Sequence, residues 1–209
     1  MRQILNRAAN SLAVVVLALL GLLPTQAQVP TPPRGSISSV ILSGKVDADV
    51  YSNGYLGISL TAPKAHWDWP DPDKVDLIGN RARLVNAVYD SGAPEAGPQE
   101  NYTLALLAES QESYPKGTTL DQFVRSLRQR VEDDNVKLYR EGFPLTIQGV
   151  PFVGTVFRFY EKPTFGYYRG LYSTILNGYL VTIEVQCGDE ERLVKRLSYA
   201  VQITPKPKR

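Results

Sequence analysis

Apolar residues alternate along the second half of the chain, and this pattern constrains the fold more than any other feature of the sequence. In residues 152–161, Phe157 and Phe159 lie on one face of an extended strand, and Phe152 and Val156 lie on the other. A strand with apolar side chains on both faces is buried on both sides. The sequence therefore predicts a β-sheet that is covered on each of its two faces.

Further segments with the same period-two pattern are predicted as strands. They are residues 45–51, 55–62, 82–90, 102–109, 136–140, 145–149, 167–176 and 179–187. The dipeptides Asn53-Gly54 and Asn177-Gly178 accept the positive φ angles of tight hairpin turns. Strands joined by such turns pair antiparallel, so we expect an antiparallel sheet.

Two other segments place apolar residues at the 3.6-residue period of an amphipathic helix. The predicted N-caps are Thr118, with Asp121 three positions on, and Asp189. The apolar stripes consist of Leu120, Phe123, Val124, Leu127 and Val131 in the first helix, and of Leu193, Val194, Leu197, Ala200 and Val201 in the second. Such helices pack on a sheet, so we expect the α+β class: an antiparallel β-sheet flanked by helices in an α/β/α sandwich.

The N-terminal segment has the three parts of a secretory signal peptide. Arg2 and Arg7 supply positive charge, residues 12–23 form an apolar run, and Ala27 ends a small-residue cleavage site. The run is about a dozen residues long, short of the roughly 18 to 20 that cross a bilayer. We therefore expect cleavage near Ala27, no retained transmembrane segment, and a secreted or periplasmic product.

We expect four successive regions along the chain. Residues 1–27 are the signal peptide, and residues 28–39 are a flexible linker because they are rich in Pro and Ser. Residues 40–204 form a single α+β domain, since no repeat or second linker interrupts them. Residues 205–209 form a basic tail.

The net charge excludes one class of partner. The chain has 23 lysines and arginines and 21 acidic residues, and removal of Arg2 and Arg7 with the signal peptide balances the two signs. A nucleic-acid-binding protein needs a basic surface, because its affinity comes largely from displacing counterions from phosphates. We therefore expect no nucleic-acid partner.

The single cysteine, Cys187, cannot close an intramolecular disulfide, so the hydrophobic core alone must stabilise the domain. It falls in register with Tyr179, Val181, Ile183 and Val185 on one face of the last predicted strand. We expect a core thiol there rather than a nucleophile.

His66 is the only histidine, so any catalytic triad or Cys-His pair must use it. No Gly-x-Ser-x-Gly motif or similar mount for a nucleophile accompanies it. We favour a solvent-facing loop histidine and expect no enzymatic activity. A hydrolase-type enzyme centred on His66 and the acidic residues after it stays as an alternative.

The segment after His66 carries four carboxylates, which are the ligands that calcium prefers. They are Asp68, Asp71, Asp73 and Asp76. A calcium loop counted from Asp71 requires glycine at its sixth position, where this chain has Asp76, and two interleaved prolines stiffen the backbone. We favour a solvated acidic turn and expect no metal and no cofactor, with calcium as the weaker alternative.

Aromatic residues indicate where a ligand or a protein partner would bind. Trp67 and Trp69 either pack at the rim of the core, which we favour, or form a stacking platform for a ligand. Tyr167, Tyr168 and Arg169, in a glycine-flanked segment, are the residues that we expect to be most exposed. These five residues are the candidate binding site, although for the aromatic strands as a whole we favour ordinary sheet packing over a partner-binding face.

Two segments have a distinctive order of turn, strand and aromatic residues. The first is YSNGYLGISLTAP at 51–63 followed by Trp67, and the second is YSTILNGYLVTI at 172–183 followed by DEERLVKRL at 189–197. Together they resemble the PsbP-like superfamily, which includes the extrinsic photosystem II subunit and Ran-binding import factors. The resemblance implies an antiparallel sheet with helices, although three residues rather than the usual two separate Pro63 from Trp67. Members of the superfamily serve unrelated roles, so no partner or site residue is implied.

Three classes of function stay open. We favour an exported, non-enzymatic accessory or binding module with a protein partner in the cell envelope, because the sequence contains no catalytic constellation. The alternatives are a small-ligand carrier with a pocket between helix and sheet, and the hydrolase centred on His66. The sequence does not indicate an oligomeric state.

Overall fold

The computed structural model describes residues 37–68, 81–89, 101–131, 135–161 and 164–204. All of them belong to the second of the two compact units into which the chain divides, which spans residues 34–209. The predicted signal peptide, most of the predicted linker and the basic tail lie outside the described residues. The site residues Trp69, Asp71, Asp73 and Asp76 also lie outside them.

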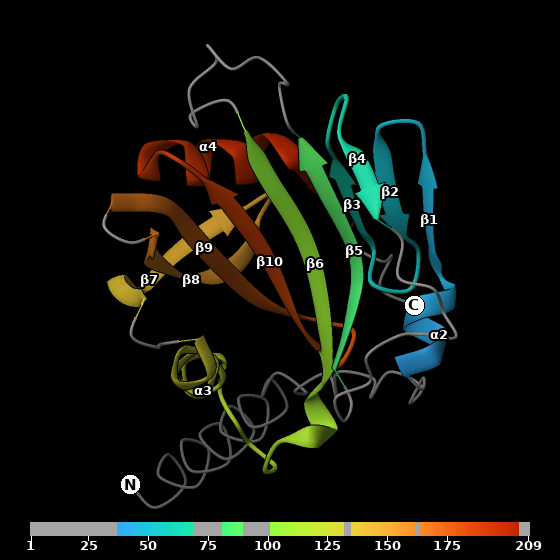
Figure 1. The fold of residues 1–209 in the computed structure, drawn as a ribbon. Helices are drawn as coiled ribbons and strands as arrows, with labels where there is room; N and C mark the ends of the chain where they lie inside the picture. Colours follow the sequence, from blue (N-terminus) through green and yellow to red (C-terminus); the bar gives the residue numbers. More distant parts are fainter. Residues whose placement is uncertain (1–36, 69–80, 90–100, 132–134, 162–163, 205–209) are drawn as a thin grey trace, which may run out of the picture. The chain divides into compact units, whose positions relative to one another are not determined.

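Within the described residues, seven antiparallel strands form a large sheet (Figure 1). In spatial order they are β4 (His66–Asp68), β5 (Arg81–Tyr89), β6 (Tyr102–Ser110), β10 (Tyr179–Cys187), β9 (Thr164–Leu176), β8 (Val150–Glu161) and β7 (Val136–Ile147). The predicted alternation in β8 is confirmed, because Phe157 and Phe159 belong to one hydrophobic cluster and Phe152 and Val156 to another. Both faces of the sheet are therefore covered.

Tight turns join the long strands. Asn177 and Gly178, between β9 and β10, have φ angles of 49° and 81°, as the sequence predicted for this hairpin. Gln148 and Gly149 make a second such turn, with φ angles of 48° and 80°. The strand before it, β7, is continuous where two strands were predicted, because shifts in its pairing to β8 near Arg140 let one strand bend.

A smaller second sheet was not foreseen. It contains β1 (Gly44–Asp47), β2 (Val50–Asn53), β3 (Ile58–Thr61) and β11 (Val201–Ile203), in that order. The last strand pairs with β3, so the two ends of the domain meet in this sheet. A short helix, α2 (Ile37–Leu42), contacts β5 and β6 and begins three residues before the predicted domain boundary.

The hairpin predicted at Asn53-Gly54 forms between β2 and β3, but its turn covers residues 54–57 rather than Asn53 and Gly54. A further short hairpin, between β1 and β2, turns at Ala48, which has a φ angle of 48°. The side chain of Asn53 is buried, donates to the Val40 carbonyl at 2.8 Å and accepts from the Leu56 amide at 3.0 Å. These contacts hold the residue at the end of β2 rather than inside a two-residue turn.

One face of the large sheet is covered by α3 (Leu120–Val131). Its cluster contains Phe123, Val124 and Leu127 from the helix, with Val136, Phe157, Leu171 and Leu180 from the strands. The cap lies one residue later than predicted: Thr119 and Gln122 exchange side-chain-to-amide hydrogen bonds of 3.3 and 2.8 Å. Such a reciprocal capping box satisfies two amide donors at the start of the helix.

The opposite face is covered by the main core, which includes α4 (Glu190–Ala200). Asp189 caps this helix as predicted and accepts from the Glu191 amide at 3.0 Å. Leu193, Leu197 and Ala200 are buried, and the helix contacts β10 and β9 of the large sheet and β3 of the small one. Val194, predicted as part of the apolar stripe, is instead 39% exposed. With helices on both faces of an antiparallel sheet, the fold is α+β, as expected.

Candidate anion-binding pocket

A pocket of about 590 Å³ opens between α4, the paired ends of β5 and β6, and the turn that leads from β3 to β4. Among the described residues, its lining consists of Pro63, Lys64, Tyr89, Tyr102, Arg192, Lys195, Arg196 and Tyr199. Four of these residues are cations and three are tyrosines, and none is acidic. The pocket thus combines positive charge with aromatic surface.

One wall of the pocket is the polar face of α4. Arg192, Lys195, Arg196 and Tyr199 follow the i, i+3, i+4 and i+7 spacing that places side chains on one side of a helix. The buried residues of the same helix fix its orientation against the sheets. The direction of the basic face is therefore set by the apolar face.

The floor of the pocket is aromatic. Tyr89 and Tyr102 are register partners at the ends of β5 and β6, and their rings stack with centroids 5.4 Å apart and planes 23° apart. The Arg196 guanidinium carbon lies 4.4 Å from the centroid of the Tyr102 ring. Burial raises the pKa of Tyr102, an effect that Arg196 opposes, so the phenol is neutral near pH 7.

The opposite wall is the turn that contains Lys64. Its backbone has a φ angle of 60°, and its amide donates to the Asp49 carboxylate at 3.1 Å. A positive φ angle is uncommon for a residue other than glycine. The hydrogen bond to Asp49 helps hold the turn in this conformation, with Lys64 facing the pocket.

The cations of the pocket differ in their ion pairs. Arg192 forms an ion pair with Asp189 at 3.6 Å, in which both side chains are more than a third exposed. Among the residues that the structure describes, no carboxylate forms an ion pair with Lys64, Lys195 or Arg196. Clustered like charges next to partly buried rings raise the local concentration of anions.

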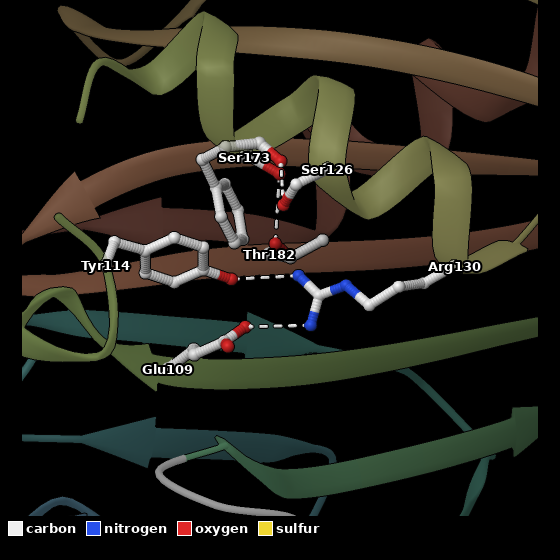
Figure 2. A network of polar contacts seen from close by, with 7 residues as sticks. Glu109, Tyr114, Ser126, Arg130, Ser173 and Thr182 are labelled. Carbon is white, nitrogen blue, oxygen red and sulfur yellow. Dashed lines mark hydrogen bonds and ion pairs between the residues drawn. The ribbon is translucent and has the colours of Figure 1, made fainter.

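A second polar cluster, on the α3 face of the sheet, is organised differently (Figure 2). Arg130 of α3 lies 3.6 Å from the Glu109 carboxylate and donates to the Tyr114 hydroxyl at 2.9 Å. Burial raises the pKa of Tyr114, and its hydrogen bond with Glu109 raises it further. Nearby, the hydroxyls of Ser173 and Thr182 share a buried hydrogen bond of 2.9 Å. The groups of this cluster are bound to one another, so it anchors α3 rather than offering a ligand site.

Of the sequence-predicted tryptophans, only Trp67 is described. It lies in β4, is partly buried and packs against the main core. Its indole Nε1 is buried and has no hydrogen-bond partner among the described parts of the chain. Trp67 is not among the residues that line the pocket.

The tyrosines and arginine of β9 do not share a surface. Tyr167 stacks on Phe159 with centroids 4.7 Å apart, and the Arg169 guanidinium lies 4.2 Å from the same ring. Tyr168 points to the other side of the strand, where it contacts Tyr139 with centroids 5.3 Å apart. Consecutive residues of a strand alternate between faces, so the three side chains are divided by the sheet.

The remaining candidates also lie apart from the pocket. The side chain of His66 is 81% exposed, and its Nε2 is 3.2 Å from Asp68. Cys187 is buried in the main core, as predicted, and burial raises the pKa of its thiol. The described residues contain no group of three or more His, Cys, Asp or Glu side chains that could hold a metal ion. None of the helices described is both long enough and apolar enough to cross a membrane.

None of the residues that line the pocket was predicted from the sequence to bind a ligand. One signal was present, because the basic and aromatic residues of α4 recur at helical spacing beside its apolar stripe. The contributions of Lys64, Tyr89 and Tyr102 had no comparable local pattern. The pocket does lie between a helix and the large sheet, the arrangement that the small-ligand carrier hypothesis requires.

The chain was compared with family models, curated proteins and solved structures. No family model matches the chain, and no curated protein matches it. Among solved structures, cyanobacterial PsbP (CyanoP) from Synechocystis sp. PCC 6803 is similar with 13% identity and a TM-score of 0.42, covering 76% of this chain and 95% of that one. LpqN, involved in cell envelope biogenesis of Mycobacterium tuberculosis, is similar with 12% identity and a TM-score of 0.37, covering 68% of this chain and 85% of that one.

Proposed function

We propose that this chain is an exported, non-enzymatic binding module that takes an anionic ligand in the pocket beside α4. The observation that carries the proposal is the composition of the lining: among the described residues it contains four cations and no acidic residue. Positive side chains that face one pocket repel one another, and an anion relieves that repulsion. The pocket volume of about 590 Å³ falls within the range of small-molecule sites.

The chemistry of the lining supports binding rather than reaction. The lining offers guanidinium, ammonium and phenol groups, and the burial-raised pKa of Tyr102 makes this phenol a weaker candidate for a general base. Guanidinium and ammonium groups donate hydrogen bonds to anionic oxygens and stay charged near neutral pH. The site therefore has the groups needed to hold an anion in place.

Export and a protein partner are further parts of the proposal. The expected cleavage near Ala27 would release the domain into the periplasm or the medium, and N-terminal sequencing of the protein from those fractions tests it. A protein partner in the cell envelope stays a proposal, but Tyr168 cannot bind it on the same surface as Tyr167 and Arg169, which lie on the other face of the sheet. Capture experiments that compare the wild type with Tyr168→Ala test the surface at Tyr168, and equal recovery of the same proteins argues against it.

The pocket is tested by charge reversal at Lys195, which is exposed and lines the pocket. Calorimetric titration with pyrophosphate should show saturable binding that weakens as salt rises, because salt screens exposed charges. Lys195→Glu should weaken this binding by about tenfold or more, since it adds a repulsive charge and removes an attractive one. Its matched control is Arg125→Glu, the same reversal on the exposed side of α3.

Binding to wild type and to Arg125→Glu with similar affinity, together with loss in Lys195→Glu, supports the proposal. Absence of binding to the wild type at low salt contradicts it. An equal loss in both variants also contradicts it, because net charge alone would then account for the affinity.

A further inference from the structure

We infer that the ligand of this pocket is a phosphate ester that also contains a planar aromatic ring, such as a nucleoside monophosphate. This inference rests on the proposed function and adds two statements to it. The anionic group is a phosphate, and another part of the same ligand is flat and aromatic. Each statement follows from a separate feature of the lining.

The phosphate is indicated by the number and kind of cations. Arg192, Lys195 and Arg196 lie within one turn and a half of α4 on the same face, and Lys64 lies on the opposite wall. A phosphate monoester carries a charge of about −1.5 to −2 at neutral pH and three terminal oxygens, whereas a carboxylate carries one charge and two oxygens. Two guanidinium groups and two ammonium groups match the larger number of acceptors.

Arg196 is held in place without being neutralised. Some arginines of the domain pair with carboxylates, as Arg128 does with Glu141 at 2.8 Å, whereas others, such as Arg158, lie over aromatic rings. Arg196 is instead positioned over the Tyr102 ring, 4.4 Å from its centroid. A ring restrains the guanidinium while leaving its net charge for another partner. This residue is therefore pre-organised to bind an anion.

The planar ring is indicated by the aromatic surfaces of the lining. Tyr89 and Tyr102 already form a stack, and Arg196 extends it with a third flat group. Tyr199 lines the same pocket and is 67% exposed, which is high for a large aromatic side chain. Aromatic and guanidinium planes are the surfaces on which heterocyclic bases stack. An inorganic phosphate alone would leave these surfaces and most of the 590 Å³ without a partner.

The decisive comparison uses probes that differ by one part. Adenosine monophosphate contains both the phosphate and the planar adenine base. Ribose 5-phosphate lacks the base, and adenosine lacks the phosphate. We expect adenosine monophosphate to bind about tenfold or more tightly than ribose 5-phosphate, because of stacking. Adenosine should bind more weakly still, because it offers no group to the cations. Citrate serves as a multivalent carboxylate without phosphate and should bind more weakly than pyrophosphate.

Two variants locate the stacking surface. Tyr199→Leu and Tyr89→Leu each keep an apolar side chain and remove a ring, and at least one should abolish the advantage of adenosine monophosphate over ribose 5-phosphate. Both variants should lose less affinity for pyrophosphate, which contacts the cations, than for adenosine monophosphate. Thermal unfolding shows whether the variants are folded.

Several outcomes would overturn the inference without removing the anion site. Equal affinities for adenosine monophosphate and ribose 5-phosphate would exclude a contribution of the aromatic ring to binding. Citrate binding as tight as pyrophosphate binding would exclude a preference for phosphate. Co-sedimentation with phosphatidylglycerol vesicles, without binding of adenosine monophosphate, would assign the cations to a lipid headgroup. Failure of every anion, pyrophosphate and citrate included, would instead remove the proposed function itself.

Discussion

The two main helices of the domain, α3 and α4, both lie on the large sheet, but their cations have different partners. On α3, Arg128 pairs with Glu141 at 2.8 Å and Arg130 lies 3.6 Å from Glu109. On α4, Arg196 is positioned by a tyrosine ring, and Lys195 forms no ion pair with the described residues. The cations of α3, which pair with carboxylates of the sheet, help to hold this helix on the sheet. The charges of Arg196 and Lys195, which form no ion pair with the described residues, are available to a ligand.

The largest expected effect comes from truncating the apolar anchors of the two helices. Leu197→Ala on α4 and Leu127→Ala on α3 each remove a fully or nearly fully buried side chain, so each should lower the free energy of unfolding by about 2–5 kcal/mol. Chemical denaturation measures this loss. Only Leu197→Ala should also weaken pyrophosphate binding to the folded protein, because only α4 carries the pocket cations. Equal loss of binding in both variants would break the distinction between the helices.

A smaller effect is expected from removing one arginine on each helix. Arg130→Met should destabilise the protein by about 1–2 kcal/mol, because it leaves the mostly buried Glu109 without its ion pair and Tyr114 without a donor. Arg196→Met should change stability by less than about 0.5 kcal/mol, since the lost cation–π contact is offset by reduced repulsion from Lys195 and its neighbours. Thermal unfolding of both variants tests the difference, and a reversed order of the two losses would contradict it.

The smallest expected effect is on the ionisation of the two tyrosines next to these arginines. Burial raises the pKa of both Tyr102 and Tyr114, and a nearby arginine lowers it in each case. Arg196→Met should therefore raise the pKa of Tyr102 further, and Arg130→Met should raise that of Tyr114. Alkaline titration followed by tyrosinate absorbance, with each tyrosine replaced by phenylalanine to assign the signal, measures the two shifts. An unchanged Tyr102 titration in Arg196→Met would contradict the contact between them.

These groups also predict the direction of the pH dependence of stability. Each tyrosine keeps its proton to a higher pH when folded than when unfolded, so it contributes stability that is fully present below its ordinary pKa of 10.0. That contribution is lost as the pH rises through the folded pKa. The buried Tyr51, whose pKa is raised to about 12, follows the same rule. Tyrosine-to-phenylalanine substitutions should accordingly flatten the alkaline branch of the stability curve.

Local sequence patterns predicted the long elements well. The two faces of β8, the Asn177-Gly178 turn and the Asp189 cap of α4 were each evident within a few residues of sequence. Failures occurred where distant contacts compete with local ones. Asn53 and Asn177 both precede glycine, but the Asn53 side chain bonds to Val40, thirteen residues away, and so does not form the predicted turn.

The candidate site was less accessible to sequence reasoning. Tyr167, Tyr168 and Arg169 were grouped because they are adjacent in sequence, yet adjacent residues of a strand face opposite ways. The period-two rule, applied to this segment, would have separated them. No such rule could have joined Lys64 to Tyr102 and Arg196, because they belong to a turn, a strand and a helix that are far apart along the chain.

The sequence by itself determined the α+β class, the antiparallel pairing and the amphipathic faces of both helices. These features depend on alternation, turn chemistry and capping, which act between residues close in the chain. Only the tertiary structure decided that the basic face of α4 meets Tyr89, Tyr102 and Lys64 around one pocket. The physical reason is that this meeting requires the β5–β6 register and the docking of α4 by its buried leucines, and both arise only when the core is packed.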